Sequence, residues 1–340
     1  MADKVKVAII GYGYWGPNLV RNFNALDSCD VTHVIDSRSE RLNLVKKNYP
    51  TITTSSDPDD AIKSKQVDAV VIATPVFVHY ELAKVALENN KHVLLEKPMT
   101  SKVSDAEDLI NIANSKNLKL MIDHTFLYTS AVQKMKELIG EGVVGNLQYV
   151  DSTRINLGLF QPDINVLWDL APHDISILNY LIDDKPSSVQ ATGASHTNNE
   201  IENIAFLTLN YNSGFIAHFN CSWSSPVKIR QMLIGGDKKM ILYNDMEPTE
   251  KVKVYDYGYT HRTDEEKNKI LVDYRMGDIY IPKIPNSEAL AGVAKDFISA
   301  IQKDVNPVSD YISGINVVKV LEAAQASLKK NGAIININYS

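Results

Sequence analysis

The feature that most constrains this chain is a glycine-rich turn between a predicted strand and a predicted helix. Residues 5–10, VKVAII, are apolar and rich in β-branched side chains, as in a strand buried in a parallel sheet. The residues that follow, GYGYWG, fit the pattern G-x-G-x-x-G in the context that dinucleotide-binding folds require. Gly11 permits the tight turn, Gly13 lets the backbone approach a pyrophosphate, and Gly16 allows close packing of helix on strand. The N–H groups that begin this helix would face the pyrophosphate.

A second predicted strand ends in an acid at the spacing that such a turn requires. Residues 31–36 read VTHVID, so Asp36 lies about 20 residues beyond the last glycine of the turn. A carboxylate there binds the ribose hydroxyls of the adenosine and repels a 2′-phosphate, which favours NAD over NADP. Arg38, two residues on, would soften that preference. The alternative is a tight turn that holds no ligand, and the combination of strand, helix and acid argues against it.

Strands and helices continue to alternate after this second strand. Predicted strands at 68–74, 92–96 and 118–122 are separated by predicted helices at 80–90 and 105–115. Repeated βα units of this length give a doubly wound parallel sheet with right-handed crossovers. Ligands on such a sheet bind beyond the carboxyl ends of the strands.

Three of these strands end in residues that can carry chemistry, namely Thr74-Pro75, Glu96-Lys97-Pro98 and Asp123-His124. Lys97 is the most informative, because the proline that follows disfavours helix and holds the lysine extended at the mouth of the sheet. There its ammonium would bond to a substrate hydroxyl or take its proton. The alternative is a solvated loop lysine.

A second motif lies at residues 166–178, VLWDLAPHDISIL. Pro172 suits the first turn of a helix. Asp169 and His173 are four residues apart, so on a helix they meet on one face. A carboxylate that is hydrogen-bonded to an imidazole stabilises its charged form, which would make His173 a good general base. The alternative is an aspartate at a helix start beside a structural histidine.

From about residue 144 the pattern changes to longer strands in which polar and apolar residues alternate. This pattern is typical of an antiparallel sheet with one face free for helices, a ligand or another subunit. The polar segment 251–274 is expected to be a solvated excursion. The predicted strands are 147–155, 188–192, 204–211, 215–223, 231–234, 239–243 and 333–337, and the predicted helices are 287–302 and 313–329.

Charge and composition restrict the ligands of this protein. The chain has 35 Lys and Arg against 41 Asp and Glu, and this net charge of −6 argues against a nucleic-acid partner but allows a small anionic ligand. The start of the chain has no apolar signal core, and the longest apolar run, 69–78, is far short of the roughly 20 residues that span a bilayer. We therefore expect a cytoplasmic protein without a membrane partner. Cys29, Cys221 and the histidines lack metal-site spacing, so no metal is expected.

These motifs occur together, and in this order, in the Gfo/Idh/MocA family of sugar and inositol dehydrogenases, which the chain resembles over nearly its whole length. The resemblance rests on the glycine turn, on Ala73-Thr74-Pro75 with His79, on Glu96-Lys97-Pro98, and on Asp169 with His173. It implies an α/β fold with an N-terminal Rossmann domain, expected at 1–124. It also implies a C-terminal α/β domain at 125–340, built on a large, open, mostly antiparallel sheet. NAD or NADP, hydride transfer at a sugar carbon, and a homo-oligomer (dimer or tetramer) formed through the C-terminal sheet are likewise expected.

The resemblance also implies the residues of the site. Lys97, Asp169 and His173 form the catalytic set, with His173 as proton acceptor and Lys97 orienting the hydroxyl. The residues expected at the cofactor are Gly11, Tyr12, Gly13, Tyr14, Trp15, Gly16, Asp36, Ser37, Arg38, Thr74, Pro75, His79, Glu96 and Lys97. Those expected at the substrate are Lys97, His124, Arg154, Asn156, Trp168, Asp169, His173, Lys228, Arg230 and Arg275. A buried structural role for His124, and simple solvation of the basic residues, remain the alternatives.

The substrate expected from these motifs is a sugar or a nucleotide sugar. The Trp168 motif, Lys228-Ile229-Arg230 and the segment 275–279 resemble the branch of the family that acts on nucleotide sugars. That branch oxidises the C3 hydroxyl of sugars such as UDP-N-acetylglucosamine or its uronic acid. The alternatives are a dehydrogenase of a free sugar or inositol, a ketoreductase on a nucleotide-linked keto-sugar, and an NAD-bound sensor without catalysis.

Overall fold

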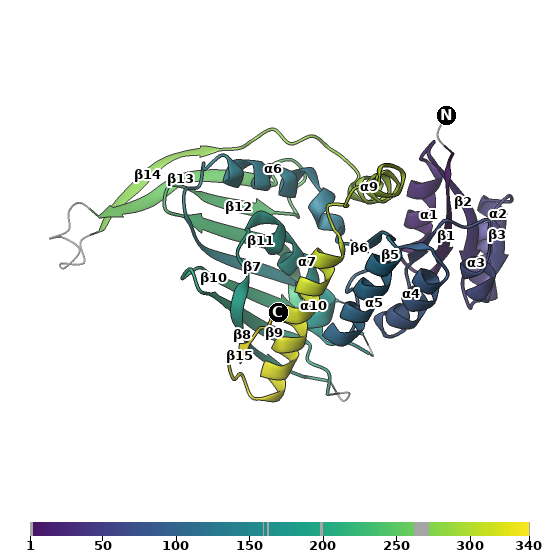
Figure 1. The fold of residues 1–340 in the computed structure, drawn as a ribbon. Coiled ribbons are helices and arrows are strands. Elements are labelled where there is room, and N and C mark those ends of the chain that lie inside the picture. Colours follow the sequence, from purple (N-terminus) through teal and green to yellow (C-terminus); the bar gives the residue numbers. More distant parts are fainter. Residues whose placement is uncertain (1–2, 159, 162, 198–199, 262–271, 340) are drawn as a thin grey trace. The chain divides into compact units, whose positions relative to one another are not determined.

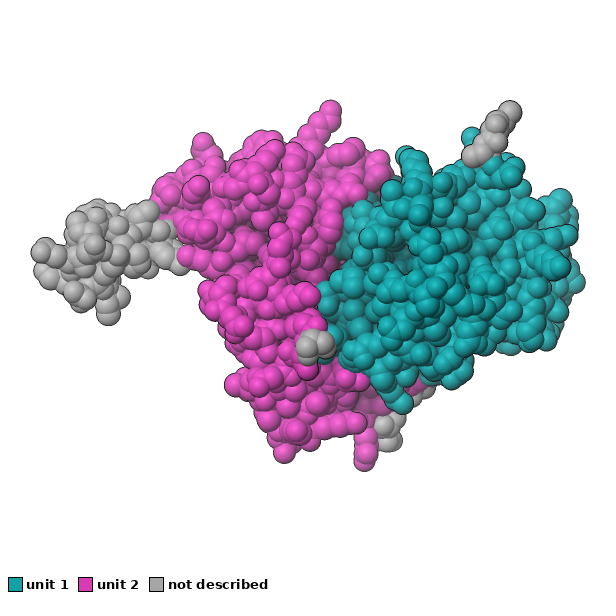
Figure 2. Space-filling model, in the orientation of Figure 1, with its two compact units in different colours: residues 1–128, 288–319 teal, residues 129–287, 320–340 magenta. Residues whose placement is uncertain are grey.

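The structure is a computed structural model that describes residues 3–158, 160–161, 163–197, 200–261 and 272–339. The chain divides into two compact units (Figure 2). Unit 1 comprises residues 1–128 and 288–319, and unit 2 comprises residues 129–287 and 320–340. The boundary expected from the sequence lies at residue 124, with a single domain after it. The structure differs, because residues 125–128 and the segment 288–319 belong to unit 1.

Unit 1 is built on a parallel sheet, as predicted (Figure 1). Within the described residues this sheet has six strands in the order β3-β2-β1-β4-β5-β6. The order reverses between β1 and β4, which is the switch point at which doubly wound sheets bind their ligands. The strands are β1 (Val5–Ile10), β2 (Cys29–Ile35), β3 (Thr53–Ser55), β4 (Ala69–Ile72), β5 (His92–Glu96) and β6 (Leu120–Asp123).

Helices connect these strands and supply the rest of the unit 1 core. The segment 288–319 belongs here because Phe297 packs against Phe23 of the first helix, with ring centroids 6.3 Å apart. Arg21 on the same helix forms an ion pair with Glu288. The helical segments are α1 (Gly16–Asn24), α2 (Ser39–Asn48), α3 (Asp59–Ile62), η1 (Val76–Val78), α4 (His79–Glu88), α5 (Val103–Ser115), η2 (Thr125–Tyr128) and α9 (Ala289–Lys303).

Unit 2 is built on a large sheet in the order β14-β13-β12-β11-β7-β10-β9-β8-β15. In its described part, β7 and β10 pair in parallel and the other neighbours pair antiparallel. The open, mostly antiparallel sheet is therefore as expected. Its strands are β7 (Leu147–Leu157), β8 (Pro186–Ala194), β9 (Ile204–Tyr211), β10 (Ile216–Ser222), β11 (Ser224–Gly236), β12 (Met240–Asn244), β13 (Val252–His261), β14 (Val272–Tyr280) and β15 (Ile335–Asn336).

The prediction of a solvated excursion at 251–274 was wrong for the part that the structure describes. This segment supplies β13 and the start of β14, which pair with each other. Val252 and Val254 are buried while Lys253 between them is less so, an alternation typical of a strand. The charged run at 264–269, which suggested the excursion, lies outside the described residues.

One face of the unit 2 sheet is covered by helices and the other is open (Figure 1). The helices are α6 (Ser130–Gly140), α7 (Val166–Leu181) and α10 (Tyr311–Lys329), of which α7 packs on β7, β9 and β10. Alternation along the strands buries Leu207 and Phe219 beneath the helices and leaves Phe206, Ile216 and Leu233 exposed. In the described part of the chain, every helix is too short or too polar to cross a bilayer.

Candidate active site

The glycine turn of unit 1 has the geometry expected of a dinucleotide-binding loop. Gly11 has a φ of +101°, and a Cβ at this position would lie 2.3 Å from the carbonyl oxygen of Ala73. A Cβ at Gly16 would lie 2.4 Å from the carbonyl oxygen of Gly11. At Gly13 an added Cβ would meet only a guanidinium nitrogen of Arg38, at 3.7 Å. The turn is therefore closed beneath Gly11 and Gly16 and open above Gly13, where a pyrophosphate would approach the N-terminus of α1.

The acid after the second strand is held beside this turn. The Asp36 carboxylate accepts the backbone N–H of Tyr12 at 2.7 Å. It also accepts Arg38 Nε at 2.9 Å and Arg38 Nη2 at 3.0 Å. Burial acts to raise the pKa of Asp36, but the hydrogen bonds from Arg38 and Tyr12 outweigh it and hold the pKa below its ordinary value. The carboxylate that would bind ribose hydroxyls and the arginine that would bind a 2′-phosphate thus form one ion pair.

The remaining residues expected at the cofactor surround this turn with different exposures. Tyr12 is buried and Ser37 is exposed. Tyr14 and Trp15 are exposed aromatic residues on the turn itself, with ring centroids 5.2 Å apart in an edge-to-face arrangement. Large exposed aromatic side chains next to an open loop are available to a ligand. This part of unit 1 therefore fits NAD or a closely related dinucleotide.

The three strand ends singled out in the sequence lie side by side at one edge of the unit 1 sheet. β4, β5 and β6 are adjacent and parallel, so Thr74, Lys97 and His124 all follow the same edge. Glu96 in β5 and Asp123 in β6 are register partners. The charge of Lys97 acts on both carboxyls and on His124. A titratable cluster therefore occupies the edge at which such sheets bind ligands.

His79 contacts the backbone that follows two of these strands. Its Nε2 lies 2.8 Å from the carbonyl oxygen of Thr74, and its Nδ1 lies 3.0 Å from the carbonyl oxygen of Pro98. The peptide bond between Lys97 and Pro98 is cis. His79 begins α4 and is 1% exposed, so its ring is a structural link between the two loops rather than a surface offered to a ligand.

Several buried polar atoms at this edge have no hydrogen-bond partner among the described residues. They are Thr74 Oγ1, Asp123 Oδ2 and both ring nitrogens of His124. Burial, with the charge of Lys97, lowers the pKa of His124 to about 3, so the ring is neutral near pH 7. A structural histidine normally has partners for its ring nitrogens. The arrangement instead fits a ring that awaits a polar ligand or a water molecule.

The second predicted motif lies on α7 in unit 2. Asn165 caps this helix by accepting the N–H of Trp168, and both Asp169 and His173 are half-buried on its face. Asp169 Oδ2 accepts Trp223 Nε1 at 3.0 Å, which fixes the carboxylate. The placement of Pro172 in the first turn was wrong. α7 begins at Val166, earlier than the proline suggested, because the Asn165 cap starts it there.

Two of the expected substrate residues of unit 2, Arg154 and Trp168, have partners within the unit. Arg154 is 3% exposed, and its Nε lies 3.0 Å from Asp174 Oδ2, in a multiply hydrogen-bonded ion pair. It therefore belongs to the core between α7 and the sheet, because a buried guanidinium needs a buried carboxylate. Trp168 is also buried, and its Nε1 donates to Gln325 at 3.1 Å. Asn156 is half-buried near the end of β7.

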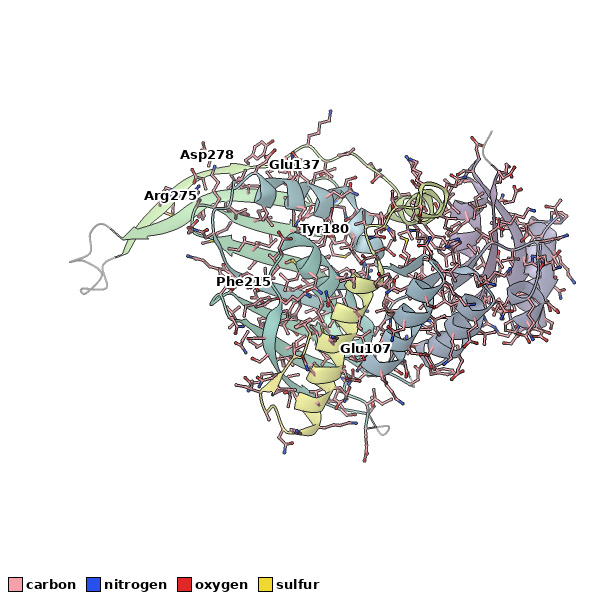
Figure 3. The ribbon with its side chains drawn as sticks, in the orientation of Figure 1. Glu107, Glu137, Tyr180, Phe215, Arg275 and Asp278 are labelled. Carbon is pink, nitrogen blue, oxygen red and sulfur yellow. The ribbon has the colours of Figure 1, made fainter. Side chains whose placement is uncertain are left out.

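The other basic residues expected at the substrate lie on different parts of the unit 2 sheet. Arg230 on β11 contacts Asp245 at 3.4 Å, and Lys228 on the same strand is exposed. Arg275 lies on the β13–β14 hairpin (Figure 3), 3.1 Å from Asp256. β14 is separated from β11 by two strands, and Arg275 donates to the carbonyl oxygen of Lys238, beyond the end of β11 that lies far from Arg230. Arg230 and Arg275 are therefore not placed to bind the same ligand group.

Two further residues take part in the candidate site but were not assigned to it from the sequence. Asp123 was noted only as a strand end, although its place after a buried strand next to Glu96 was a usable signal. Trp223, which is fully buried and holds Asp169, was read only as part of a strand. Its role depends on tertiary packing, for which the sequence pattern carries no signal.

Comparison with known proteins agrees with this reading of the two units. Residues 5–124 match the model described as "Oxidoreductase family, NAD-binding Rossmann fold", and residues 132–242 match the "GFO/IDH/MocA C-terminal domain". The chain is 25% identical to UDP-N-acetylglucosamine 3-dehydrogenase of Acidithiobacillus ferrooxidans, over 96% of this chain and 99% of that one. A crystal form of that enzyme superposes with a TM-score of 0.79 at 24% identity, covering 96% of this chain and 99% of that chain.

The chain is also similar to two other bacterial oxidoreductases. The scyllo-inositol 2-dehydrogenase (NADP(+)) IolW of Bacillus subtilis is 26% identical over 98% of this chain and 96% of its own. An uncharacterised oxidoreductase of Escherichia coli, YdgJ, is 34% identical over 185 residues, which is 51% of this chain and 52% of that protein. The chain thus aligns with about half the length of YdgJ.

Proposed function

Since the chain belongs to the Gfo/Idh/MocA family of NAD-binding oxidoreductases, we propose that it transfers a hydride between a sugar carbon and the nicotinamide of NAD. The observation that carries this proposal is the strand-end cluster around Lys97. It combines a cation, two carboxyls and unpartnered polar atoms at the ligand-binding edge of a dinucleotide-binding sheet. A substrate hydroxyl at this edge would need polar partners. Thr74 Oγ1 and the ring nitrogens of His124 have no other hydrogen-bond partner among the described residues.

The proposed roles follow from the chemistry of alcohol oxidation. When bound, NAD would supply the nicotinamide ring that accepts the hydride from the carbon. The hydroxyl proton must leave as the carbonyl forms, and His173 on α7 is proposed to accept it. Lys97 would donate a hydrogen bond to the same oxygen and orient it, and Asp169, fixed by Trp223, would stabilise the charged imidazole. Positioned acid–base groups of this kind contribute about 10²- to 10⁴-fold to rate.

The proposed substrate is a nucleotide sugar oxidised at C3, such as UDP-N-acetylglucosamine or its uronic acid. The full-length similarity to the Acidithiobacillus ferrooxidans enzyme supports it. The second candidate is an inositol or a free sugar, which the equally extensive similarity to the Bacillus subtilis inositol enzyme supports. Because Arg38 and Asp36 are paired beside the turn, NAD is proposed first and NADP second.

The test is a screen of hydride transfer with UDP-N-acetylglucosamine, its uronic acid, myo-inositol and glucose, each with NAD and with NADP. The proposal expects reduction of the cofactor with a nucleotide sugar and a loss of about 10²- to 10⁴-fold in the His173→Ala variant. Each negative result is repeated in reverse with the keto-sugar and reduced cofactor. Activity that His173→Ala retains in full would overturn the role of His173. The absence of turnover in both directions, with NAD still bound, would favour a sensor.

Cofactor binding can be measured separately from turnover. A ligand at 100 times its Kd stabilises the folded state by about 2.7 kcal/mol, which appears as a rise in Tm. We expect this rise with NAD, and a smaller one in the Gly13→Val variant, whose side chain would occupy the open space above the turn. No rise with either dinucleotide would contradict the assignment of the cofactor.

We also propose that the open face of the unit 2 sheet joins two copies of the chain. Phe206 on β9, Ile216 on β10 and Leu233 on β11 leave 37–44% of their surface exposed on that face, and β7 lies between β10 and β11. Exposed apolar patches on a soluble fold mark interaction surfaces. Light scattering should give an oligomer for the wild type and a smaller species for Leu233→Glu. A monomer at micromolar concentration would rule this interface out.

A further inference from the structure

Glu96, which is half-buried, and Asp123, which is buried, form a pair of acids at the edge of the unit 1 sheet. They are register partners on neighbouring parallel strands, so their Cα atoms stand about 4.8 Å apart and their side chains project from the same face. Asp123 is 2% exposed, and Leu95 and Ile122, which precede the two acids, are fully buried. Two carboxylates that share such a site cannot both ionise without a large cost.

The hydrogen bonds of the pair leave Asp123 Oδ2 able to take a proton. Glu96 Oε2 accepts the backbone N–H of Lys97 at 3.2 Å. Asp123 Oδ1 accepts the hydroxyl of Thr125 at 2.7 Å. Asp123 Oδ2 is buried and has no partner among the described residues. A proton on the pair can therefore sit on Asp123 Oδ2 without displacing either existing hydrogen bond.

The charges around the pair also favour a proton on one of the two acids. The titratable groups next to the pair are Lys97 and His124, which directly follow the two acids. Of the groups on neighbouring elements, His79 at the start of α4 contacts the Pro98 carbonyl, and Asp310 pairs through its backbone with Met121 of β6. His124 is neutral near pH 7. Among the described residues, Lys97 is the cation that acts on both Glu96 and Asp123. One ammonium facing two ionised carboxylates would leave an uncompensated buried charge.

We propose that Glu96 and Asp123 keep one proton between them at neutral pH and so present a single negative charge to the ammonium of Lys97. The two acids are then a positioning pair. They hold Lys97 at the strand end with a charge that matches its own, and they lose the match when the shared proton leaves. The role toward Lys97 rests on the proposed function, whereas the shared proton does not.

The pKa shifts of Glu96 and Asp123 are consistent with this geometry. Burial raises the pKa of Glu96 first, and the neighbouring Asp123 raises it further, against the opposing charge of Lys97. Burial raises the pKa of Asp123 as well, and the Thr125 hydroxyl and Lys97 oppose it. When two groups interact this strongly, the titration belongs to the pair rather than to either residue.

Infrared spectroscopy tests the shared proton without reference to activity. The wild type at pH 7 should show the C=O band of a protonated carboxylic acid, and both Glu96→Gln and Asp123→Asn should remove it. Glu107→Gln on α5 is the matched control, because it makes the same chemical change at an exposed carboxyl and should leave the band in place (Figure 3). A wild type without the band, or a band that survives in both variants, would overturn the proposal.

Proton counting by calorimetry gives a second readout that a merely structural role would not move. Unfolding the wild type near pH 6 should release about one more proton than unfolding Glu96→Gln, because the folded pair binds a proton that unfolded carboxyls do not. Should Glu96→Gln fail to fold, Asp123→Asn carries the same measurement. Equal proton release in the wild type, in both acid-pair variants and in Glu107→Gln would contradict the pair.

The role toward Lys97 is tested by the pH profile of kcat/KM once a substrate is found. The wild type should show a step as the pair loses its proton, and Glu96→Gln should lack that step. An unchanged step in Glu96→Gln and in Asp123→Asn would overturn the positioning role. A protein that carries the infrared band but oxidises no sugar would contradict the proposed function and leave the shared proton established, so the two failures are distinguishable.

Discussion

Two buried charged pairs, one in each unit, show opposite solutions to the cost of burying charge. In unit 2, Arg154 and Asp174 have side chains only 4% and 5% exposed and compensate each other through several hydrogen bonds. In unit 1, Glu96 and Asp123 are like charges on neighbouring strands, and Lys97 faces both. The first pair is complete within the core. The second sets two carboxyls against one cation, so its charges balance only while the pair keeps the proposed proton.

Two basic residues of the candidate site also differ in their surroundings. From the sequence, Arg154 and Lys97 were both expected to contact the substrate. The arginine has its carboxylate partner in the core of unit 2. The lysine follows β5, and its charge acts on Asp123 and His124, whose Oδ2 and ring nitrogens have no hydrogen-bond partner among the described residues. A buried cation with a dedicated partner supports packing. A cation beside acids that it cannot fully neutralise is suited to chemistry.

The largest expected effect comes from breaking the compensated pair. Asp174→Ala should lower the free energy of unfolding by about 3–5 kcal/mol, because it leaves the Arg154 guanidinium buried without its carboxylate. Chemical denaturation measures the loss. The double variant Arg154→Met with Asp174→Leu should recover most of it, since both charges are then gone. A double variant as unstable as the single one would show that the pair contributes through packing alone.

A smaller change in stability, of opposite sign, is expected at Glu96 and Asp123. A carboxyl whose pKa is raised by folding lowers stability as pH rises from about 4, where unfolded carboxyls titrate, through its folded pKa. Asp123→Asn removes that penalty, so at pH 8 the variant should be about 1–3 kcal/mol more stable relative to the wild type than at pH 5. Denaturation at both pH values measures the difference. Equal differences at pH 5 and pH 8 would contradict the raised pKa.

The smallest effect concerns the hydroxyl that holds Asp123. Thr125→Val removes the O–H donor to Asp123 Oδ1 and should cost about 1 kcal/mol, with a larger loss at pH 8 than at pH 5 because the ionised carboxylate needs the donor more. Thr53→Val, at an exposed position of β3, is the matched control and should show no pH dependence. A loss at Thr125 that is independent of pH would mean that the hydroxyl does not act on the charged form.

How far the sequence predicted these regions follows from the range of the interactions. The roles of Gly11, Gly13 and Gly16 depend on local geometry, and the convergence of three strand ends follows from a parallel sheet, so both were accessible. The return of the segment 288–319 to unit 1 depends on packing of Phe297 on Phe23, which no local pattern records.

The misassigned residues show the same limit at single positions. The burial of Arg154 depends on Asp174, a partner from another element. The cap at Asn165 set the start of α7 in place of Pro172, although a proline is the stronger sequence signal. Where a residue's role is decided by its neighbour in space, the residue type alone predicted the wrong surroundings.

Isotope transfer shows whether the Lys97 edge of unit 1 serves hydride transfer from a sugar. UDP-N-acetylglucosamine that carries deuterium at C3 is incubated with NAD and the wild type, and the nicotinamide is analysed by NMR or mass spectrometry. We expect deuterium at C4 of the reduced nicotinamide, and a yield lower by about 10²- to 10⁴-fold in Lys97→Met at equal NAD binding. Deuterium that stays on the sugar, with the inositol and free-sugar substrates equally unreactive, would contradict it.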